Sequence, residues 1–139
     1  MDIIDERLIA AAVTARENAD PSLTGFRCGA AVLTSGGLIF SGSNAEIHAG
    51  QILHAETFAL GAARNAGHSD IIAMAVVAKS EKPCTPCGQC REWIRAYMPP
   101  SAPVFVFNIN DGQTLSLRVG DLLTNPPDLA DDIDDMRIR

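Results

Sequence analysis

Apolar residues recur at helical spacing in three stretches of the chain. In the first, Leu8, Ala12 and Ala15 repeat every three or four residues behind an acidic start, as in an amphipathic helix. The second ends in Asn-Ala-Gly at 65–67, a C-terminal stop signal, and the third ends before Pro99. The predicted helices therefore cover residues 2–19, 54–64 and 88–98.

Shorter apolar runs, rich in β-branched residues, predict strands between these helices. The run 71–78 is apolar throughout, which is typical of a strand buried on both faces. The turn Ser35-Gly36-Gly37 joins two short runs into a hairpin, and residues 42–52 have the composition of a loop. The predicted strands cover residues 28–34, 38–41, 71–78, 104–108 and 115–119. This order of elements predicts a three-layer α/β domain with a mixed sheet.

Length and composition fit one domain over residues 1–127, followed by an acidic tail at 128–139. The net charge is −6 and the basic residues are scattered, which argues against a nucleic acid partner. Neither a signal peptide nor a membrane-spanning run is expected. With four cysteines, two of them at ligand spacing, metal binding in the cytoplasm is favoured over a disulfide framework.

Two short motifs carry the candidate chemistry: His-Ala-Glu at 54–56 and Pro-Cys-Gly-Gln-Cys at 86–90. His54, Cys87 and Cys90 make three ligands for Zn²⁺, a number that leaves a fourth position open for water, as in catalytic zinc sites. Glu56 is a carboxylate beside this set, suited to take a proton from water and pass it to a leaving group. The pattern H-x-E with P-C-x-x-C is the signature of zinc-dependent nucleobase deaminases.

A second pair of cysteines also fits the spacing, because Pro83 to Cys87 reads P-C-x-x-C as well. We favour Cys87 with Cys90, since the sequence from Gly88 onward is helical and both sulfurs then project from one turn. If Cys84 were a fourth ligand, the site would be closed and structural. A non-catalytic, zinc-stabilised binding protein is therefore one alternative.

Over residues 26–123 the chain resembles the small, single-domain members of the cytidine deaminase family. The resemblance is carried by residues 26–31 (FRCGAA), 42–46 (GSNAE), 54–56 (HAE) and 86–92 (PCGQCRE). It implies a five-stranded sheet between helices and a zinc-dependent hydrolysis of cytidine or deoxycytidine to the uridine product and ammonia. It also implies pyrimidine salvage and a homotetramer, with a dimer as the other possibility.

By position, the resemblance also implies roles at the substrate. Asn44 and Glu46 would hydrogen-bond the ribose 3′-hydroxyl, and Phe26 would pack against the nucleoside. The backbone of Ala55 would contact the pyrimidine. Arg91, next to a ligand in the sequence, would temper the charge of the two thiolates.

The chain departs from the family pattern at several positions. His54 and Thr57 stand where small members commonly carry Cys and Arg. Three thiolates on Zn²⁺ form a negatively charged site that benefits from the nearby Arg, whereas one imidazole and two thiolates form a neutral site. The loss of the Arg is therefore consistent with the change of ligand. Residues 47–53 look one residue short and lack the aromatic residue that the family has there. Residues 124–127 lack the aromatic residue that follows the last helix in the family. A modified aminopyrimidine nucleoside such as blasticidin S is therefore an alternative substrate, although such deaminases lack a carboxylate matching Glu46.

Three further residues have plainer interpretations. His48 and His68 are expected to face solvent, with contact to substrate as the alternative for His48, which lies in the pocket loop. Cys28 is expected to be an inert thiol in the core. Residues 120–123 match the last helix of the family.

Overall fold

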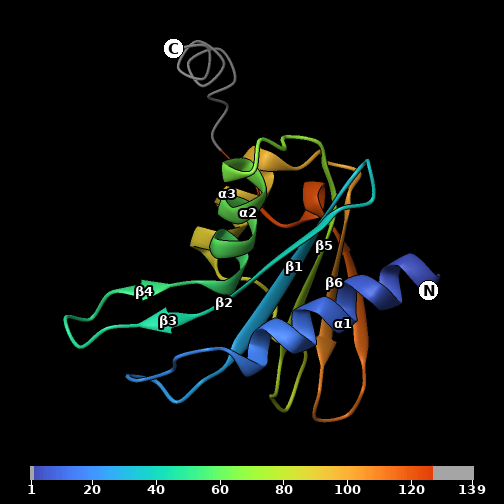
Figure 1. The fold of residues 1–139 in the computed structure, drawn as a ribbon. Coiled ribbons are helices and arrows are strands. Elements are labelled where there is room, and N and C mark those ends of the chain that lie inside the picture. Colours follow the sequence, from blue (N-terminus) through green and yellow to red (C-terminus); the bar gives the residue numbers. More distant parts are fainter. Residues whose placement is uncertain (1, 127–139) are drawn as a thin grey trace.

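The computed structural model describes residues 2–126, so the tail expected at 128–139 lies outside the described residues. Figure 1 shows the arrangement of the elements. In chain order they are α1 (Ile3–Glu17), β1 (Cys28–Thr34), β2 (Ile39–Ser43), β3 (Ala45–Glu46), β4 (Ile52–Leu53), α2 (Ala55–Asn65), β5 (Ile71–Ala78), α3 (Gly88–Tyr97), β6 (Pro103–Asn108), β7 (Thr114–Arg118) and the 3₁₀ turn η1 (Val119–Asp121). No helix among residues 2–126 has the length and apolar character needed to cross a bilayer.

Five strands form one mixed sheet in the order β2-β1-β5-β6-β7. Only β5 and β6 pair in parallel, and the other neighbours are antiparallel. A parallel pair needs a crossover connection, which here contains α3. The structure thus confirms the predicted α/β fold with a mixed five-stranded sheet.

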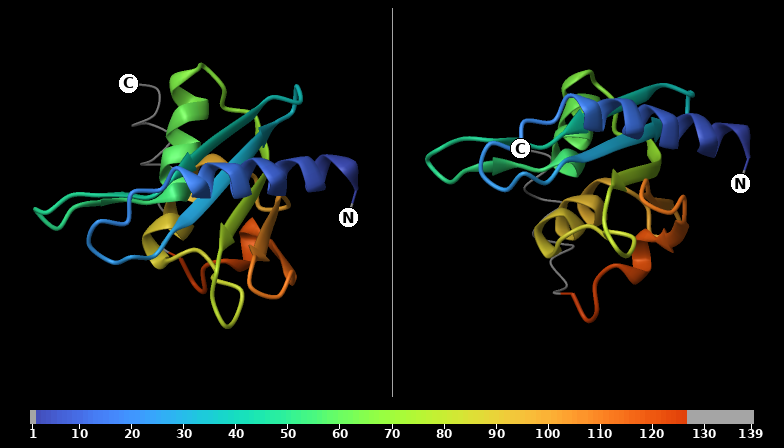
Figure 2. Two further views of the ribbon diagram at one scale, coloured as in Figure 1. Left: turned by 60° about the horizontal axis from the view of Figure 1, so that its bottom comes forward. Right: turned by 90° about the horizontal axis from the view of Figure 1, so that it is seen from below.

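Alternating residues of the central strands fill two separate cores. Ala30 and Val32 of β1 join the core beneath α2 and α3, whereas Ala31 and Leu33 join the core beneath α1. This alternation follows from the two-residue period of a strand, and it places one helical layer on each face. Figure 2 shows α1 lying across the strands of the sheet.

The segment 42–52 is where the predicted loop is wrong. Strand β2 continues to Ser43, and β3 and β4 then form a small antiparallel pair, with Glu46 opposite Ile52. Gly50 closes the turn at φ 84°, a left-handed conformation that glycine adopts freely. In Figure 1 this hairpin extends as an arm away from the sheet. Strands of two residues have no periodicity to detect, so the sequence could not predict them.

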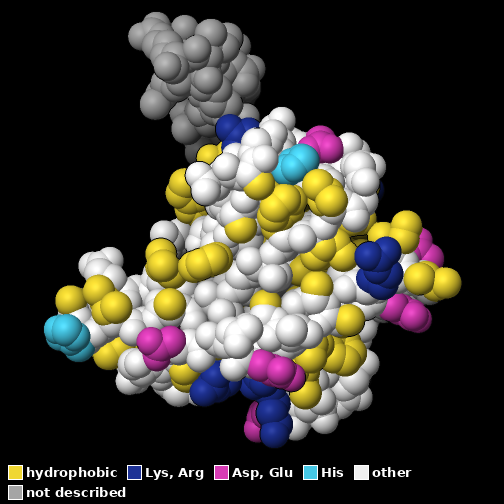
Figure 3. All heavy atoms as spheres, in the orientation of Figure 1, with side chains coloured by type: hydrophobic (Ala, Val, Ile, Leu, Met, Phe, Trp, Pro, Cys, Tyr) yellow, Lys and Arg dark blue, Asp and Glu magenta, His cyan; other side chains and the backbone are white. Residues whose placement is uncertain are grey.

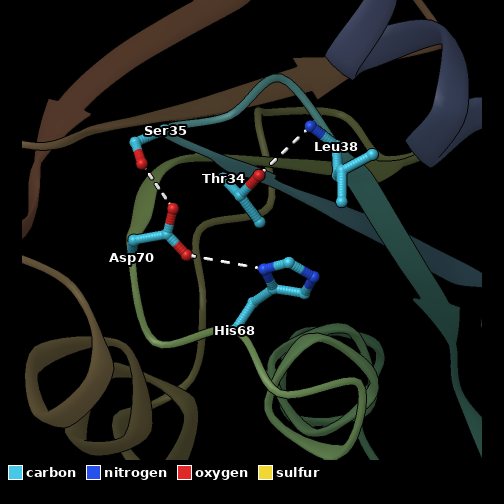
Figure 4. A network of polar contacts seen from close by, with 5 residues as sticks. All are labelled: Thr34, Ser35, Leu38, His68 and Asp70. Atoms are coloured by element: carbon cyan, nitrogen blue, oxygen red, sulfur yellow. Dashed lines mark hydrogen bonds and ion pairs between the residues drawn. The ribbon is translucent and has the colours of Figure 1, made fainter.

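Two smaller expectations also need correction. Residues 120–123 contain only the end of a 3₁₀ turn, not an α-helix. His68 is half-buried, where it packs against the Phe40 ring and lies 3.7 Å from Asp70. Figure 4 shows that Asp70 also accepts a hydrogen bond from Ser35, so this network ties the β1–β2 turn to the loop before β5.

The first turns of α2 rest directly on the backbone of β2 at Gly42. A Cβ atom there would lie 2.7 Å from the Ala59 nitrogen and 2.9 Å from the Ala55 oxygen. Gly42→Ala is therefore expected to lower the free energy of unfolding by about 1–3 kcal/mol, because α2 must move.

Denaturant unfolding checks this, with Gly61→Ala as the control. Gly61 lies on the exposed side of α2 with open space around its Cα, so that change should stabilise the protein by up to about 1 kcal/mol. Equal effects of the two variants would contradict the argument.

Candidate metal centre and its pocket

The N-termini of α2 and α3 bring three potential ligands together. His54 is the N-cap of α2 and Cys87 the N-cap of α3, both in extended backbone conformation. Their Nδ1 and Sγ atoms are 3.5 Å apart. With Cys90, in the first turn of α3, all three donor atoms lie within 4.8 Å of one another. Residues far apart in sequence are thus fixed on rigid helix ends, as a metal centre requires.

The chemistry of this donor set fits zinc. Imidazole and thiolate are the ligands that Zn²⁺ prefers, and three of them leave one position open. Within residues 2–126, His54, Cys87 and Cys90 form the single group of three or more such donors, and Cys84 does not belong to it. Burial and the nearby Glu56 carboxylate raise the pKa of the Cys90 thiol, a preference for the neutral form that a bound cation opposes.

Glu56 lies beside this trio without belonging to it. The side chain is 5% exposed, and its Oε2 atom is 3.3 Å from the Cys90 sulfur. It sits in the first turn of α2, two residues after His54. A carboxylate held in this way can exchange protons with anything bound next to the three donors.

A pocket of about 250 Å³ opens onto the donor set. All four residues expected to contact substrate line this pocket, as do two of the three potential ligands. Its walls comprise Thr24, Phe26, Cys28, Asn44, Glu46, Ile52, His54, Ala55, Glu56, Cys84, Thr85 and Cys87. His48 is not among them and is exposed in the turn of the arm.

Cys28 is less completely buried than the sequence suggested. Its side chain is half-buried, and it lines the pocket while packing against the core beneath α2. Burial, with a contribution from Glu56, raises the pKa of this thiol. Cys28 is the first residue of β1, where its side chain is only partly covered, whereas the residues that follow it in the strand are buried.

Asn44 and Glu46 also line the pocket, and both are buried. The Glu46 carboxylate accepts hydrogen bonds from the backbone N–H groups of Leu23 and Thr24, at 3.0 and 2.8 Å. These bonds, led by the one from the Thr24 backbone, hold the pKa of Glu46 below its usual value. The carboxylate is therefore negative at neutral pH, and it gives the pocket an acidic end.

The guanidinium of Arg91 holds the loop before the ligands. It donates to the Pro86 carbonyl at 2.8 Å, to the Leu122 carbonyl at 2.7 Å and to the Thr85 hydroxyl at 3.0 Å. These bonds connect α3, the loop that precedes Cys87 and the turn after β7. The contacts support a positioning role, and the tempering of thiolate charge stays a prediction.

Arg91→Met is expected to lower the free energy of unfolding by about 2 kcal/mol, because the hydrogen bonds that the charged guanidinium donates are lost. Zinc affinity should fall by about 10- to 100-fold, as for other partners that orient ligands. Thermal unfolding and competition with a chelator measure the two effects. Arg118→Met is the control, because Arg118 makes only an exposed ion pair with Asp121, which contributes little. An unchanged zinc affinity in Arg91→Met would contradict the positioning role.

Sequence reasoning missed several residues of the pocket wall, chiefly Thr24, Ile52 and Thr85. They lie in loops or in the two-residue strand β4. No periodic pattern marks such positions. The one available signal was their nearness in sequence to Phe26, His54 and Cys87.

Comparison with known proteins identifies the family. A family model, the cytidine and deoxycytidylate deaminase zinc-binding region, matches residues 2–105. The cytidine deaminase of Halalkalibacterium halodurans is 34% identical over 119 residues, which are 85% of this chain and 89% of the relative. That of Sporosarcina psychrophila is 39% identical over 110 residues, or 78% of this chain and 79% of the relative.

Solved structures agree with this result. Cytidine deaminase from Burkholderia pseudomallei superimposes with a TM-score of 0.85 at 34% identity, covering 91% of this chain and 100% of that one. The enzyme from Mycobacterium tuberculosis gives a TM-score of 0.74 at 26% identity, covering 89% and 97%. The agreement of sequence, fold and donor set shows that the chain belongs to the family of zinc-binding cytidine and deoxycytidylate deaminases.

Proposed function

We propose that this protein catalyses the hydrolytic deamination of cytidine and deoxycytidine, which yields uridine or deoxyuridine and ammonia. The observation that carries the proposal is the position of Glu56. It is a buried carboxylate 3.3 Å from a ligand sulfur, outside the trio of donors, and it faces a pocket large enough for a small molecule. A purely structural metal site has no use for such a group.

His54, Cys87 and Cys90 would hold the zinc ion, which supplies the Lewis acidity that makes water acidic at neutral pH. Glu56 takes the proton from water and holds it on its carboxylate. It delivers this proton to the ring nitrogen of the base as the hydroxide adds to C4. It then takes the second proton, from the hydroxyl now at C4, and passes it to the amino group, which leaves as ammonia. One carboxylate thus serves as base and as acid, and the overall reaction consumes one water and releases one ammonia.

The remaining wall residues would orient the nucleoside. The Phe26 side chain is 39% exposed at the pocket, and we assign it to packing against the nucleoside. The Ala55 backbone would contact the pyrimidine, and Asn44 and Glu46 would face the sugar. Because Glu46 is negative, a phosphate at that end would be repelled, so we expect nucleosides to be preferred over nucleotides.

The assembly we propose is a homotetramer, with a dimer as the alternative. A second hollow, of about 350 Å³, lies between β4, α2 and α3 and includes Leu53, Phe58 and Trp93. These three side chains are 57%, 48% and 44% exposed, a concentration of apolar surface that a second copy would cover. Figure 3 shows hydrophobic side chains gathered near α2 and where the arm joins the body. Light scattering on the purified protein would distinguish tetramer, dimer and monomer.

We also place the protein in the cytoplasm, in pyrimidine salvage. All four cysteines are free thiols, which supports a reducing compartment. The partner we propose is a small nucleoside, not a nucleic acid or a membrane.

A substrate panel tests the proposed function. The zinc-loaded protein would be offered cytidine, deoxycytidine, CMP and blasticidin S, and the loss of aminopyrimidine absorbance followed. Turnover of the two nucleosides, with CMP much slower, is the expected result. Turnover of blasticidin S alone would overturn the substrate assignment, since nothing in the pocket geometry favours it.

A further inference from the structure

The groups of the candidate metal centre are divided between two helices. His54 and Glu56 stand at the start of α2. Cys87 and Cys90 stand at the start of α3. The His54 Nδ1 atom lies 3.5 Å from the Cys87 sulfur, and Glu56 Oε2 lies 3.3 Å from the Cys90 sulfur. Both distances join one helix to the other, so the geometry of the centre depends on how the two helices are placed.

The two helices have separate anchors. Arg91 ties α3 to the loop that precedes Cys87 and to the turn after β7. The first turns of α2 lie instead against the backbone of β2 at Gly42. A displacement of α2 away from β2 would therefore move His54 and Glu56, while α3 and its cysteines stay tied in place.

Gly42 is required here for the space that it leaves. Its backbone has an ordinary strand conformation, so the left-handed region plays no part. A Cβ atom at Gly42 would lie 2.7 Å from the Phe58 Cβ and 2.9 Å from the Ala55 oxygen. Neither neighbour is the end of a flexible side chain that could turn away. Because carbon atoms in contact lie about 3.5–4.0 Å apart, α2 and β2 would have to separate by up to about 1 Å.

Strand β2 is held from two sides. It pairs with β1 from Ile39 to Ser43, and α1 contacts it from the face opposite α2. The strand has little room to retreat toward α1. A side chain at Gly42 would therefore displace α2.

We propose that Gly42 is a positioning residue: the lack of a side chain at this point of β2 sets how closely α2 approaches the sheet, and so places His54 and Glu56 opposite the cysteines of α3. This inference rests on the proposed deaminase function. A misplacement of about 1 Å can lower a catalysed rate on the order of 100-fold. Residues that only orient metal ligands contribute about 10- to 100-fold in metal affinity.

Gly42→Ala is compared with Gly29→Ala, a change on the neighbouring strand β1 that points to the other face of the sheet. A Cβ atom at Gly29 would lie 2.6 Å from the Arg16 nitrogen and closer still to the Ala12 oxygen, both in α1. This variant should lose at least as much stability without touching α2. Both changes are made in the Gly61→Ala protein, whose expected extra stability keeps the variants folded.

The first readout needs no activity. With Co²⁺ in place of zinc, the visible absorption bands report the geometry of the ligands. These bands should change in Gly42→Ala and stay those of the Gly61→Ala parent in Gly29→Ala. Zinc affinity, from competition with a chelator, should fall by about 10- to 100-fold in Gly42→Ala. The value of kcat for cytidine at full zinc should fall on the order of 100-fold in the same variant.

Cobalt bands, zinc affinity and kcat that keep the parent values in Gly42→Ala would overturn the inference. Equal losses in Gly42→Ala and Gly29→Ala would overturn it as well, because the effect would then be one of stability alone. If the cobalt bands change as expected but even the parent leaves cytidine untouched, the positioning of α2 by Gly42 is supported and the proposed function fails.

Discussion

Replacing Glu56 by glutamine is expected to lower kcat for cytidine by a factor on the order of 10⁴, the upper range for a single acid-base group. Glutamine has the same shape but cannot take or deliver the proton. Because Glu56 is outside the donor trio, zinc content should stay near one ion per chain. Steady-state kinetics and metal analysis on the same sample measure both quantities.

The result separates an enzyme from a protein that uses zinc only for stability. In a structural site Glu56 would have no proton to move, so Glu56→Gln would leave every measured property nearly unchanged. Thr57→Val is a suitable control, since Thr57 follows Glu56 and its hydroxyl only bonds the His54 carbonyl. Full activity in Glu56→Gln would remove the basis of the proposed mechanism.

Replacing Cys87 by serine is expected to weaken zinc binding by more than about 100-fold. Mutating a residue that only hydrogen-bonds a metal ligand already lowers metal affinity by about 10- to 100-fold, and Cys87 is itself a ligand. Cys87 is exposed at the helix end, so the fold should survive the change. Activity should fall with zinc occupancy and should not recover fully at high zinc. Chelator competition followed by activity measurement checks both expectations.

Cys84→Ser is the matched control, because Cys84 lines the same pocket but is absent from the donor trio. It should retain zinc at the wild-type level. Loss of zinc from Cys84→Ser, with normal zinc in Cys90→Ser, would assign the site to the other P-C-x-x-C pair. Loss of zinc from each of Cys84→Ser, Cys87→Ser and Cys90→Ser would indicate a closed, four-ligand site.

The sequence predicted the elements that have a clear period or clear ends. The strand Ile71–Ala78 lies where its apolar run begins and ends. Helix α3 begins after Cys87 and ends one residue before the predicted Met98. The arm of β3 and β4 could not be predicted, because its pairing depends on a turn and on two residues per strand.

The candidate site likewise contains residues that the sequence could predict and contacts that it could not. His54, Cys87 and Cys90 could be grouped by residue type and spacing alone, and the structure places their donor atoms together. The contacts of Arg91 with Pro86 and Leu122 could not be foreseen. They depend on how two loops fold back on α3. For the same reason Thr24 drew no notice in the sequence, although it contacts Glu46 through both its backbone and its side chain.

The most direct test of the central claim is to incubate the zinc-loaded protein with cytidine in ¹⁸O-labelled water and analyse the products by mass spectrometry. Hydrolytic deamination predicts uridine with one ¹⁸O atom at position 4 and one ammonia for each uridine formed. Unchanged cytidine, in the presence of about one zinc per chain, would contradict the account.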